Sequence, residues 1–301
     1  MTTIWSILLA ILIFGCIIAI HEFGHFIAAK RNGIQVNEFA IGMGPKIFHF
    51  QKGETLYSLR LFPVGGFCSM EGEDAESKNA CAFDQKPVWR RMIVVLAGAF
   101  MNLVLGFVLL IATTCSDPYL ISNTIHGFHE QATSNTCGLQ TGDTIVSLNG
   151  SHIFTITDLQ YKLSNESGEP FTVVVERDGK KVKLQDVTFR DQETNDWLDF
   201  SLEPQQKTVF HVLSYAAKDT VATGKLIWMS LTELVTGKYG IQDLSGPVGT
   251  VEVISNAATA GATAAERISS VLHLTIFITI NVGIFNLLPI PGLDGSRFWF
   301  L

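Results

Sequence analysis

The residues best suited to carry chemistry are His21, Glu22 and His25, which form the motif HEFGH. The two histidines are spaced i and i+4, so on a helix both imidazoles lie on one face and can reach the same metal ion. Neutral imidazole is a favoured ligand of Zn²⁺. The glutamate would lie next to that metal and could accept a proton from a water bound there. The pattern therefore indicates a zinc site with a general base beside it.

The motif stands near the end of an apolar run, where polar side chains are costly. Residues 1–20 contain no charged side chain, and apolar residues resume after His25 as far as Ala29. An unpaired ionisable group at membrane depth costs several kcal/mol and usually marks a functional site. The alternative is a pair of ordinary helix histidines with a solvated glutamate, and the apolar surroundings disfavour it.

Three apolar runs organise the chain of 301 residues: 1–29, 92–115 and 268–293. Each is about long enough to cross a bilayer as a helix, which takes roughly 20 residues. Glu22 is the only acidic or basic side chain in these runs, apart from the histidines. The first run lacks a basic start and a convincing cleavage site, so we interpret it as a retained span and not as a signal peptide. The sequence predicts an α-helical membrane protein.

The charges predict how these spans are oriented. Nine of the 21 Lys and Arg residues lie between the first and second runs, and four of them form pairs beside the spans. By the positive-inside rule this loop faces the cytoplasm, and the N-terminus and segment 116–267 would lie outside it. We therefore expect a multi-pass protein of the cell membrane. The formal net charge of −7 argues against nucleic-acid binding.

Two β-rich segments interrupt the apolar runs. Residues 54–71 alternate as strand, turn and strand, with Pro63 and the glycines at 65 and 66 in the turn. They form either a small cytoplasmic hairpin or an edge strand that offers its backbone to a partner. Residues 117–205 contain strand patterns separated by turn signals, which predicts a compact β-rich module with a short helix. Residues 206–267 are predicted to be helical and at most to lie along a membrane surface.

The third apolar run supplies a candidate for the third protein ligand that a catalytic zinc needs. Asp294 follows this run in NLLPIPGLDG, after Pro289 and Pro291. These prolines must break the helix, which at membrane depth is tolerated only where protein or a water-filled cavity lines the break. Alone, Asp294 fits an ordinary Asp-Gly turn. The alternation of spans, however, brings it to the same cytoplasmic side as His21 and His25, where the three would meet at one depth.

The order of motifs over nearly the whole chain resembles that of bacterial site-2 proteases, the regulated intramembrane zinc metalloproteases. The motifs are HEFGH, FAIGMGPKIF, FPVGGFCSMEGED, AGAFMN, LSGPVG and NLLPIPGLDG. The stretch GLQTGDTIVSLNG, together with the helix after it, resembles a PDZ domain. The combination of HExxH with NxxPxPxLDG in apolar spans is very specific to the site-2 protease family.

The resemblance assigns roles to residues. It implies His21, His25 and Asp294 as zinc ligands and Glu22 as the catalytic base. It implies that segment 54–71 forms a membrane-dipping hairpin that pairs with the substrate. The residues it suggests for substrate binding are Asn102, Asn286, Leu59, Leu61, Gly65 and Gly66. Two departures from the family pattern, Ala99 in place of a proline and Cys137 in place of an alanine, do not touch the zinc set.

The expected organisation follows the chain. It comprises span one with HExxH over 1–30, a cytoplasmic loop over 31–90 that contains the hairpin 54–71, span two over 91–116, a PDZ-like domain over 117–205, a helical linker over 206–267 and span three with the LDG motif over 268–301. The resemblance also implies a fourth span after the LDG motif. Because the sequence stops at Leu301, we expect that span to be missing.

The expected function is cleavage of transmembrane segments of single-span membrane proteins. The resemblance suggests anti-sigma factors already trimmed by another protease, or remnant signal peptides, as substrates. Two alternatives stay open. A membrane zinc transporter would use His and Asp in spans, but it would not need Glu22 or a PDZ-like insertion. An inactive PDZ scaffold that recruits partners would not need an intact set of His21, Glu22, His25 and Asp294.

Overall fold

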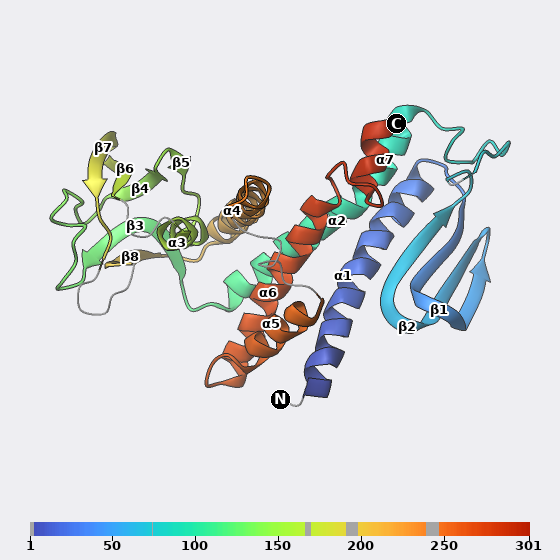
Figure 1. Cartoon of the computed structure of the whole chain (residues 1–301), viewed down its shortest axis with the longest axis horizontal. Coiled ribbons are helices and arrows are strands. Elements are labelled where there is room, and N and C mark those ends of the chain that lie inside the picture. The colour runs from blue at the N-terminus through green and yellow to red at the C-terminus, as the bar shows by residue number, and fades with distance from the viewer. Residues whose placement is uncertain (1–2, 74, 166–169, 191–197, 239–246) are drawn as a thin grey trace. The chain divides into compact units, whose positions relative to one another are not determined.

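The computed structural model describes residues 3–73, 75–165, 170–190, 198–238 and 247–301 (Figure 1). The chain divides into two compact units. The first consists of Met1–Leu109 and Gly237–Leu301, and the second of Leu110–Thr236.

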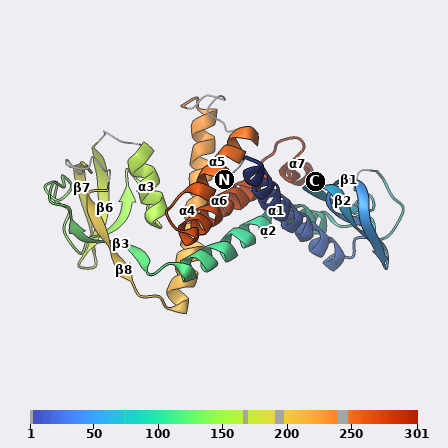
Figure 2. The ribbon, with the colours of Figure 1, turned by 90° about the horizontal axis from the view of Figure 1, so that it is seen from below.

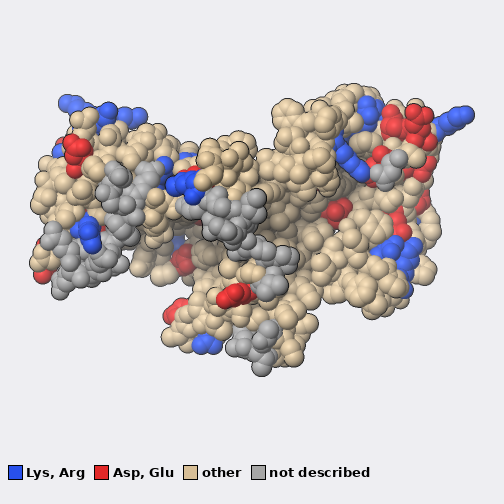
Figure 3. All heavy atoms as spheres, in the orientation of Figure 1, with Lys and Arg blue, Asp and Glu red and all other residues tan. Residues whose placement is uncertain are grey.

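Long apolar helices form the frame of the first unit. Among the described residues, three helices are long and apolar enough to cross a membrane: α1 (Thr3–Arg31), α2 (Val88–Ser116) and α6 (Ala264–Phe285). They coincide with the three apolar runs, which confirms the predicted membrane-protein class. In Figure 3, acidic and basic side chains gather over the β1–β2 sheet and the loop that follows it, and few lie over the long helices. The fourth span that the resemblance implies for the family stays a prediction.

Close helix contacts at glycines hold this frame together. A Cβ atom at Gly24 of α1 would lie 2.4 Å from the carbonyl oxygen of Ala97 on α2, and one at Gly283 of α6 would lie 3.0 Å from that of Ala99. Small residues let helix backbones approach in this way in membranes. As a result α2 lies against both α1 and α6, and its residues 94–102 face the HEFGH turn.

Helix α5 (Pro247–Thr259) completes the helical part of the first unit. Ile254 of α5 is fully buried in a cluster with Ile17 of α1 and Ile278 of α6. Within the segment 206–267 the described helices are Val209–Val235, Pro247–Thr259 and the first residues of α6. Its residues 239–246, which include the start of the LSGPVG motif, lie outside the described residues.

Two long, bent strands, β1 (Val36–Lys52) and β2 (Thr55–Met70), form an antiparallel sheet beside α1. Each strand folds back on itself, so Phe39 lies opposite both Cys68 and Tyr57, and Tyr57 lies opposite both Phe39 and Phe50. The bends divide the two strands into four paired segments, which we call legs. Their order across the sheet is 66–70, 36–41, 56–59 and 48–52. No described strand pairs with the outer side of leg 66–70.

This arrangement corrects the predicted hairpin. We expected 54–71 to turn at Gly65–Gly66 and pair with itself, but leg 36–41 lies between its two halves, and the tight turn joins Lys52 to Thr55. The stretch FAIGMGPKIF, which contains two glycines and a proline, lies in the bent strand β1. Those residues allow the bend: Gly42 has φ +83°, and a Cβ there would lie 2.6 Å from the carbonyl oxygen of Phe62.

The second unit contains a six-stranded sheet with the order β7-β6-β4-β3-β8, and β5 pairs with β4. The strands are β3 (Leu120–Phe128), β4 (Thr144–Leu148), β5 (Ser151–His152), β6 (Phe171–Arg177), β7 (Lys180–Val187) and β8 (Phe200–Gln205). Its core contains the fully buried Leu148, Leu159 and Val173. Two of the expected turns are present, at Asn149–Gly150 and Asp178–Gly179, where all four residues have positive φ. The sheet-rich module is confirmed, and its likeness to a PDZ domain stays a prediction.

Two helices, α3 (Ile156–Asn165) and α4 (Val209–Val235), belong to the same unit as this sheet. In Figure 2, α3 lies between the sheet and α4. The buried carboxylate of Asp219 on α4 accepts hydrogen bonds from Thr155 (2.6 Å) and Thr157 (2.8 Å) beside α3. We expected the module to end at residue 205 and α4 to be linker, but these contacts make α4 part of the module.

Candidate active site

His21, His25 and Asp294 meet at one point, although 269 residues separate the last two in sequence. Nε2 of His21 lies 2.9 Å from Oδ2 of Asp294, Nε2 of His25 lies 3.2 Å from the same oxygen, and the two nitrogens are 3.2 Å apart. Both histidines are buried. Among the described residues this is the one cluster of His, Cys, Asp or Glu suited to hold a metal. The structure thus brings together the three predicted ligands.

The histidine rings are held from behind by α2. Nδ1 of His25 lies 2.8 Å from the carbonyl oxygen of Val94. A carbonyl only accepts hydrogen bonds, so Nδ1 carries the ring proton and Nε2 presents its lone pair to the cluster. Nδ1 of His21 lies 3.2 Å from the side-chain nitrogen of Asn102. Both rings therefore direct Nε2 toward Asp294.

Gly98 leaves the space that a metal ion at this cluster requires. A Cβ atom at this position of α2 would lie 2.3 Å from Nε2 of His25 and 2.6 Å from Nε2 of His21. Any other residue would place carbon next to both ligand nitrogens. Two imidazole nitrogens and one carboxylate are a donor set that catalytic zinc sites use, with a further position open. The residues present therefore fit Zn²⁺.

The break after α6 carries Asp294 to the histidines. Helix α6 ends at the cap residue Asn286, shortly before Pro289, which cannot donate to a continuing helix. The chain then loops back, and the N–H of Gly295 donates to the carbonyl of Asn286 at 2.7 Å. A Cβ at Gly295 would lie 2.2 Å from the carbonyl oxygen of Leu288, so the glycine of LDG is needed for the loop to close. Helix α7 (Asp294–Phe300) starts at the ligand itself.

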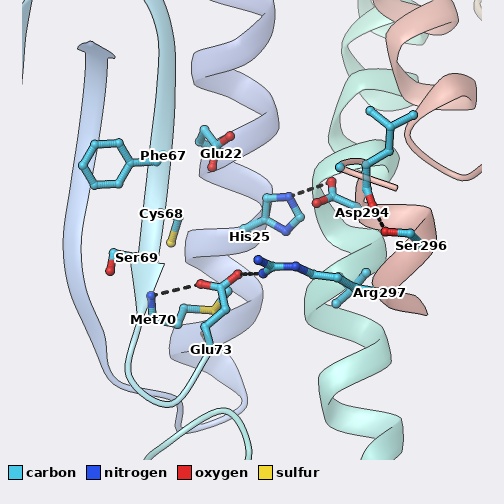
Figure 4. A pocket seen from close by; sticks show the side chains of 13 residues that line it. Glu22, His25, Phe67, Cys68, Ser69, Met70, Glu73, Asp294, Ser296 and Arg297 are labelled. Carbon is cyan, nitrogen blue, oxygen red and sulfur yellow. Dashed lines mark hydrogen bonds and ion pairs between the residues drawn. The ribbon is translucent and has the colours of Figure 1, made fainter. Parts of the chain in front are cut away.

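A pocket of about 600 Å³ adjoins the cluster (Figure 4). Glu22, His25 and Asp294 line it together with leg 66–70 of the sheet, which contributes Phe67 to Met70. Glu22 lies beside this leg, since a Cβ at Gly66 would lie 3.5 Å from its Cγ. Burial raises the pKa of the Cys68 thiol, with a further increase from the nearby acidic charges, so this thiol stays protonated. The pocket therefore offers a carboxylate base beside a metal site and no thiolate nucleophile.

The profile of peptidase family M50 matches residues 9–301. The chain belongs to peptidase family M50. A protein named as a zinc metalloprotease in Clostridium acetobutylicum is 35% identical over 300 residues, which cover 99% of this chain and 86% of the relative. RasP of Bacillus subtilis, named a regulator of sigma-W protease, is 30% identical over 386 residues, with 98% and 89% covered. A zinc metalloprotease named in Fusobacterium nucleatum is 32% identical over 308 residues, with 98% and 87% covered.

These relationships confirm the predicted family and cofactor. The chain is a zinc metalloprotease of the site-2 type, and Zn²⁺ is its cofactor. A zinc transporter and an inactive scaffold, the two alternatives, do not fit this membership. The assignment of the individual ligands and of the base is not tested by the comparisons and stays a proposal that the geometry supports.

The residues expected to bind substrate in this M50 protease lie in different places. Asn102 is fully buried behind His21, and the side chain of Asn286 donates to the carbonyl of its own helix at Val282 (2.9 Å). Neither lines the pocket. Leu59 and Leu61 are about half exposed, and neither lines the pocket.

The two glycines of the expected set also differ from one another. Gly65 has φ +88° and lies against Met43, away from the catalytic residues. A Cβ at Gly66 would lie 3.5 Å from Cγ of Glu22. Of the six expected substrate contacts, Gly66 is thus the one next to the candidate base.

Sequence reasoning did not identify Gly98, or residues 67–70 of leg 66–70, as parts of the site. Gly98 lies in AGAFMN, which drew attention to its asparagine, because a glycine carries no functional group. The leg 67–70 lies in a motif that was noticed, but its place at the pocket depends on how β1 and β2 fold back on each other.

Proposed function

We propose that this protein hydrolyses peptide bonds in the transmembrane segments of single-span membrane proteins, with Glu22 as base and His21, His25 and Asp294 as zinc ligands. The observation that carries the proposal is the pocket itself. It brings Glu22, the metal cluster and a strand leg with one unpaired edge together in a chain with three membrane-length helices.

The chemistry assigned to the side chains follows from their positions. Zinc, when bound, lowers the pKa of a water molecule and polarises a scissile carbonyl. Glu22 takes a proton from the attacking water and later delivers it to the leaving amine nitrogen. The Glu22 side chain lines the same pocket as His25 and Asp294. His25 is kept in the required tautomer by the Val94 carbonyl.

Leg 66–70 is the proposed docking edge for the substrate. A helical substrate hides its carbonyls in its own hydrogen bonds and must unwind before cleavage. Pairing as an added strand would offset part of that cost. The N–H of Met70 points to the open side of this leg, where it donates to Glu73 at 3.3 Å. The first half of the expected hairpin 54–71 does not suit this role, because leg 56–59 is paired on both sides.

The surface of the β1–β2 sheet supports contact with lipid. Three of its charged residues are paired, since Glu38 forms ion pairs with Arg60 (2.8 Å) and Lys46 (3.2 Å). These partners and Ser58 hold the pKa of Glu38 below its usual value, against the effect of burial. The large apolar residues exposed on the sheet are Ile41, Met43, Ile47, Phe48, Phe50, Leu59, Leu61, Phe62 and Val64.

The proposed substrates are anti-sigma factors or remnant signal peptides that another protease has already trimmed. The name of the Bacillus subtilis relative as a regulator of sigma-W protease supports the first class. We place the active site toward the cytoplasm and the PDZ-like module outside it, because the basic residues cluster in the loop between the first two spans. The module would then limit which substrates gain access.

The test compares wild-type protein with Glu22→Gln, which keeps size and hydrogen bonding but cannot accept a proton. Purified protein in detergent is incubated with a single-span substrate, and cleavage and zinc content are measured. We expect turnover to fall by roughly 10² or more and zinc to stay bound. Glu176→Gln, at an exposed position of β6, is the matched control and should cleave normally. Equal cleavage by wild type and Glu22→Gln would refute the proposal, and loss of zinc would make Glu22 a ligand.

A further inference from the structure

We propose that Asn102 is a positioning residue for His21: its side-chain oxygen accepts the Nδ1 proton of His21 and so keeps the lone pair of Nε2 directed at the metal. This inference rests on the proposed zinc site and replaces the substrate-binding role that the sequence suggested for Asn102.

The surroundings of Asn102 exclude direct contact with a substrate. The residue is 0% exposed and does not line the pocket. Its backbone carbonyl accepts a hydrogen bond from the hydroxyl of Thr279 on α6 at 3.2 Å. The side chain contacts the catalytic cluster at one place, 3.2 Å from Nδ1 of His21. Any effect on the reaction therefore has to pass through that histidine.

The two tautomers of His21 make different demands on this contact. A neutral imidazole has one N–H, so a ring that binds metal through Nε2 carries its proton on Nδ1. That proton needs an acceptor, which His25 has in the Val94 carbonyl. At His21 the corresponding neighbour is the Asn102 amide, and only its oxygen can accept. In the structure the amide nitrogen faces the ring, which suits the opposite tautomer.

The free oxygen of the amide makes the required orientation accessible. Oδ1 of Asn102 is buried and has no hydrogen-bond partner among the described residues. Rotating the side-chain amide of Asn102 by half a turn therefore breaks no hydrogen bond of Oδ1. The rotation brings Oδ1 to the Nδ1 proton of His21. The contact from Thr279 stays in place because it uses the backbone carbonyl. An amide is the side chain that can pair with either tautomer, since it has a donor and an acceptor on one planar group.

The test measures the zinc affinity of the purified full-length chain by competition with a chelator. Removing the outer partner of a metal-bound histidine typically costs 10- to 100-fold in affinity. We expect that loss for Asn102→Leu, which has a similar size but no acceptor. Asn102→Asp, which can only accept, should restore affinity to within a few-fold of wild type. Thr279→Val, which removes a buried hydrogen bond from the backbone of Asn102 without touching His21, is the matched control.

The outcomes separate this role from others. Equal losses in Asn102→Leu and Asn102→Asp, or a comparable loss in Thr279→Val, would show a purely structural role and overturn the inference. If Asn102→Leu bound zinc with wild-type affinity and showed a raised KM, Asn102 would be a substrate-binding residue and the inference would be wrong. Should Asn102→Leu fail to fold, Asn102→Ala removes the same acceptor without added bulk. Zinc that survives His21→Ala would overturn the proposed site itself, whereas full activity of Glu22→Gln with normal zinc would overturn the proposed function alone.

Discussion

Replacing Gly98 by alanine should expel zinc from this protease, because the glycine supplies the space beside both histidines. The new methyl carbon would lie 2.3 Å from Nε2 of His25 and 2.6 Å from Nε2 of His21, and below 3.0 Å a neighbouring atom has to shift. The rings cannot retreat easily, since Val94 and Asn102 hold them from the other side. Zinc sits about 2.0–2.1 Å from a histidine nitrogen, so the methyl and the ion compete for the same space.

The size of the effect follows from the cost of such overlap. Inserting a methyl into a well-packed region costs typically about 1–3 kcal/mol. If the free energy of zinc binding must offset that cost, zinc affinity falls by about 5- to 150-fold, at about 1.4 kcal/mol per factor of ten. Because the overlap falls on the ligand atoms themselves, we expect a loss of about 100-fold or more.

The assay compares Gly98→Ala with Gly106→Ala, a matched change on the same helix. A Cβ at Gly106 would lie 2.5 Å from Cγ1 of Ile280, a side chain away from the metal cluster. We expect Gly106→Ala to unfold at lower temperature and yet to bind zinc with wild-type affinity. Gly98→Ala should retain its fold in detergent and lose zinc. If folded Gly98→Ala competed with a chelator as well as wild type does, the metal could not lie between these histidines.

Further predictions concern the pocket and the second unit. Removing zinc with a chelator should abolish cleavage, and adding zinc back should restore it. In a variant without native cysteines, Ser69→Cys should form a disulfide with a substrate cysteine near the scissile bond, whereas Leu59→Cys should not; the reverse result would make leg 56–59 the docking edge. Glu73→Ala should lower KM by about fivefold, the equivalent of the roughly 1 kcal/mol hydrogen bond to Met70 that a substrate has to displace, and an unchanged KM would contradict that competition. Deleting residues 119–236 should preserve zinc and cleavage of short substrates, and loss of zinc would place a ligand in the second unit.

The metal cluster could be predicted from the sequence because its signals are local. His21 and His25 are related by one helical turn, and an apolar run makes an ionisable group conspicuous. The alternation of spans across the membrane predicts that Asp294 lies on the same side as these histidines. That prediction depends only on where the apolar runs begin and end. The turn signals of the second unit, such as Asn149–Gly150, are likewise properties of neighbouring residues.

Features that depend on tertiary packing could not be predicted in this way. The essential property of Gly98 is the absence of a side chain next to two residues of another helix. The pairing of Phe39 with both Cys68 and Tyr57 requires two strands to bend together, and the residues that permit the bend resemble a loop. The extension of the second unit through α4 depends on a buried contact of Asp219 with Thr155, two residues that are 64 positions apart in sequence.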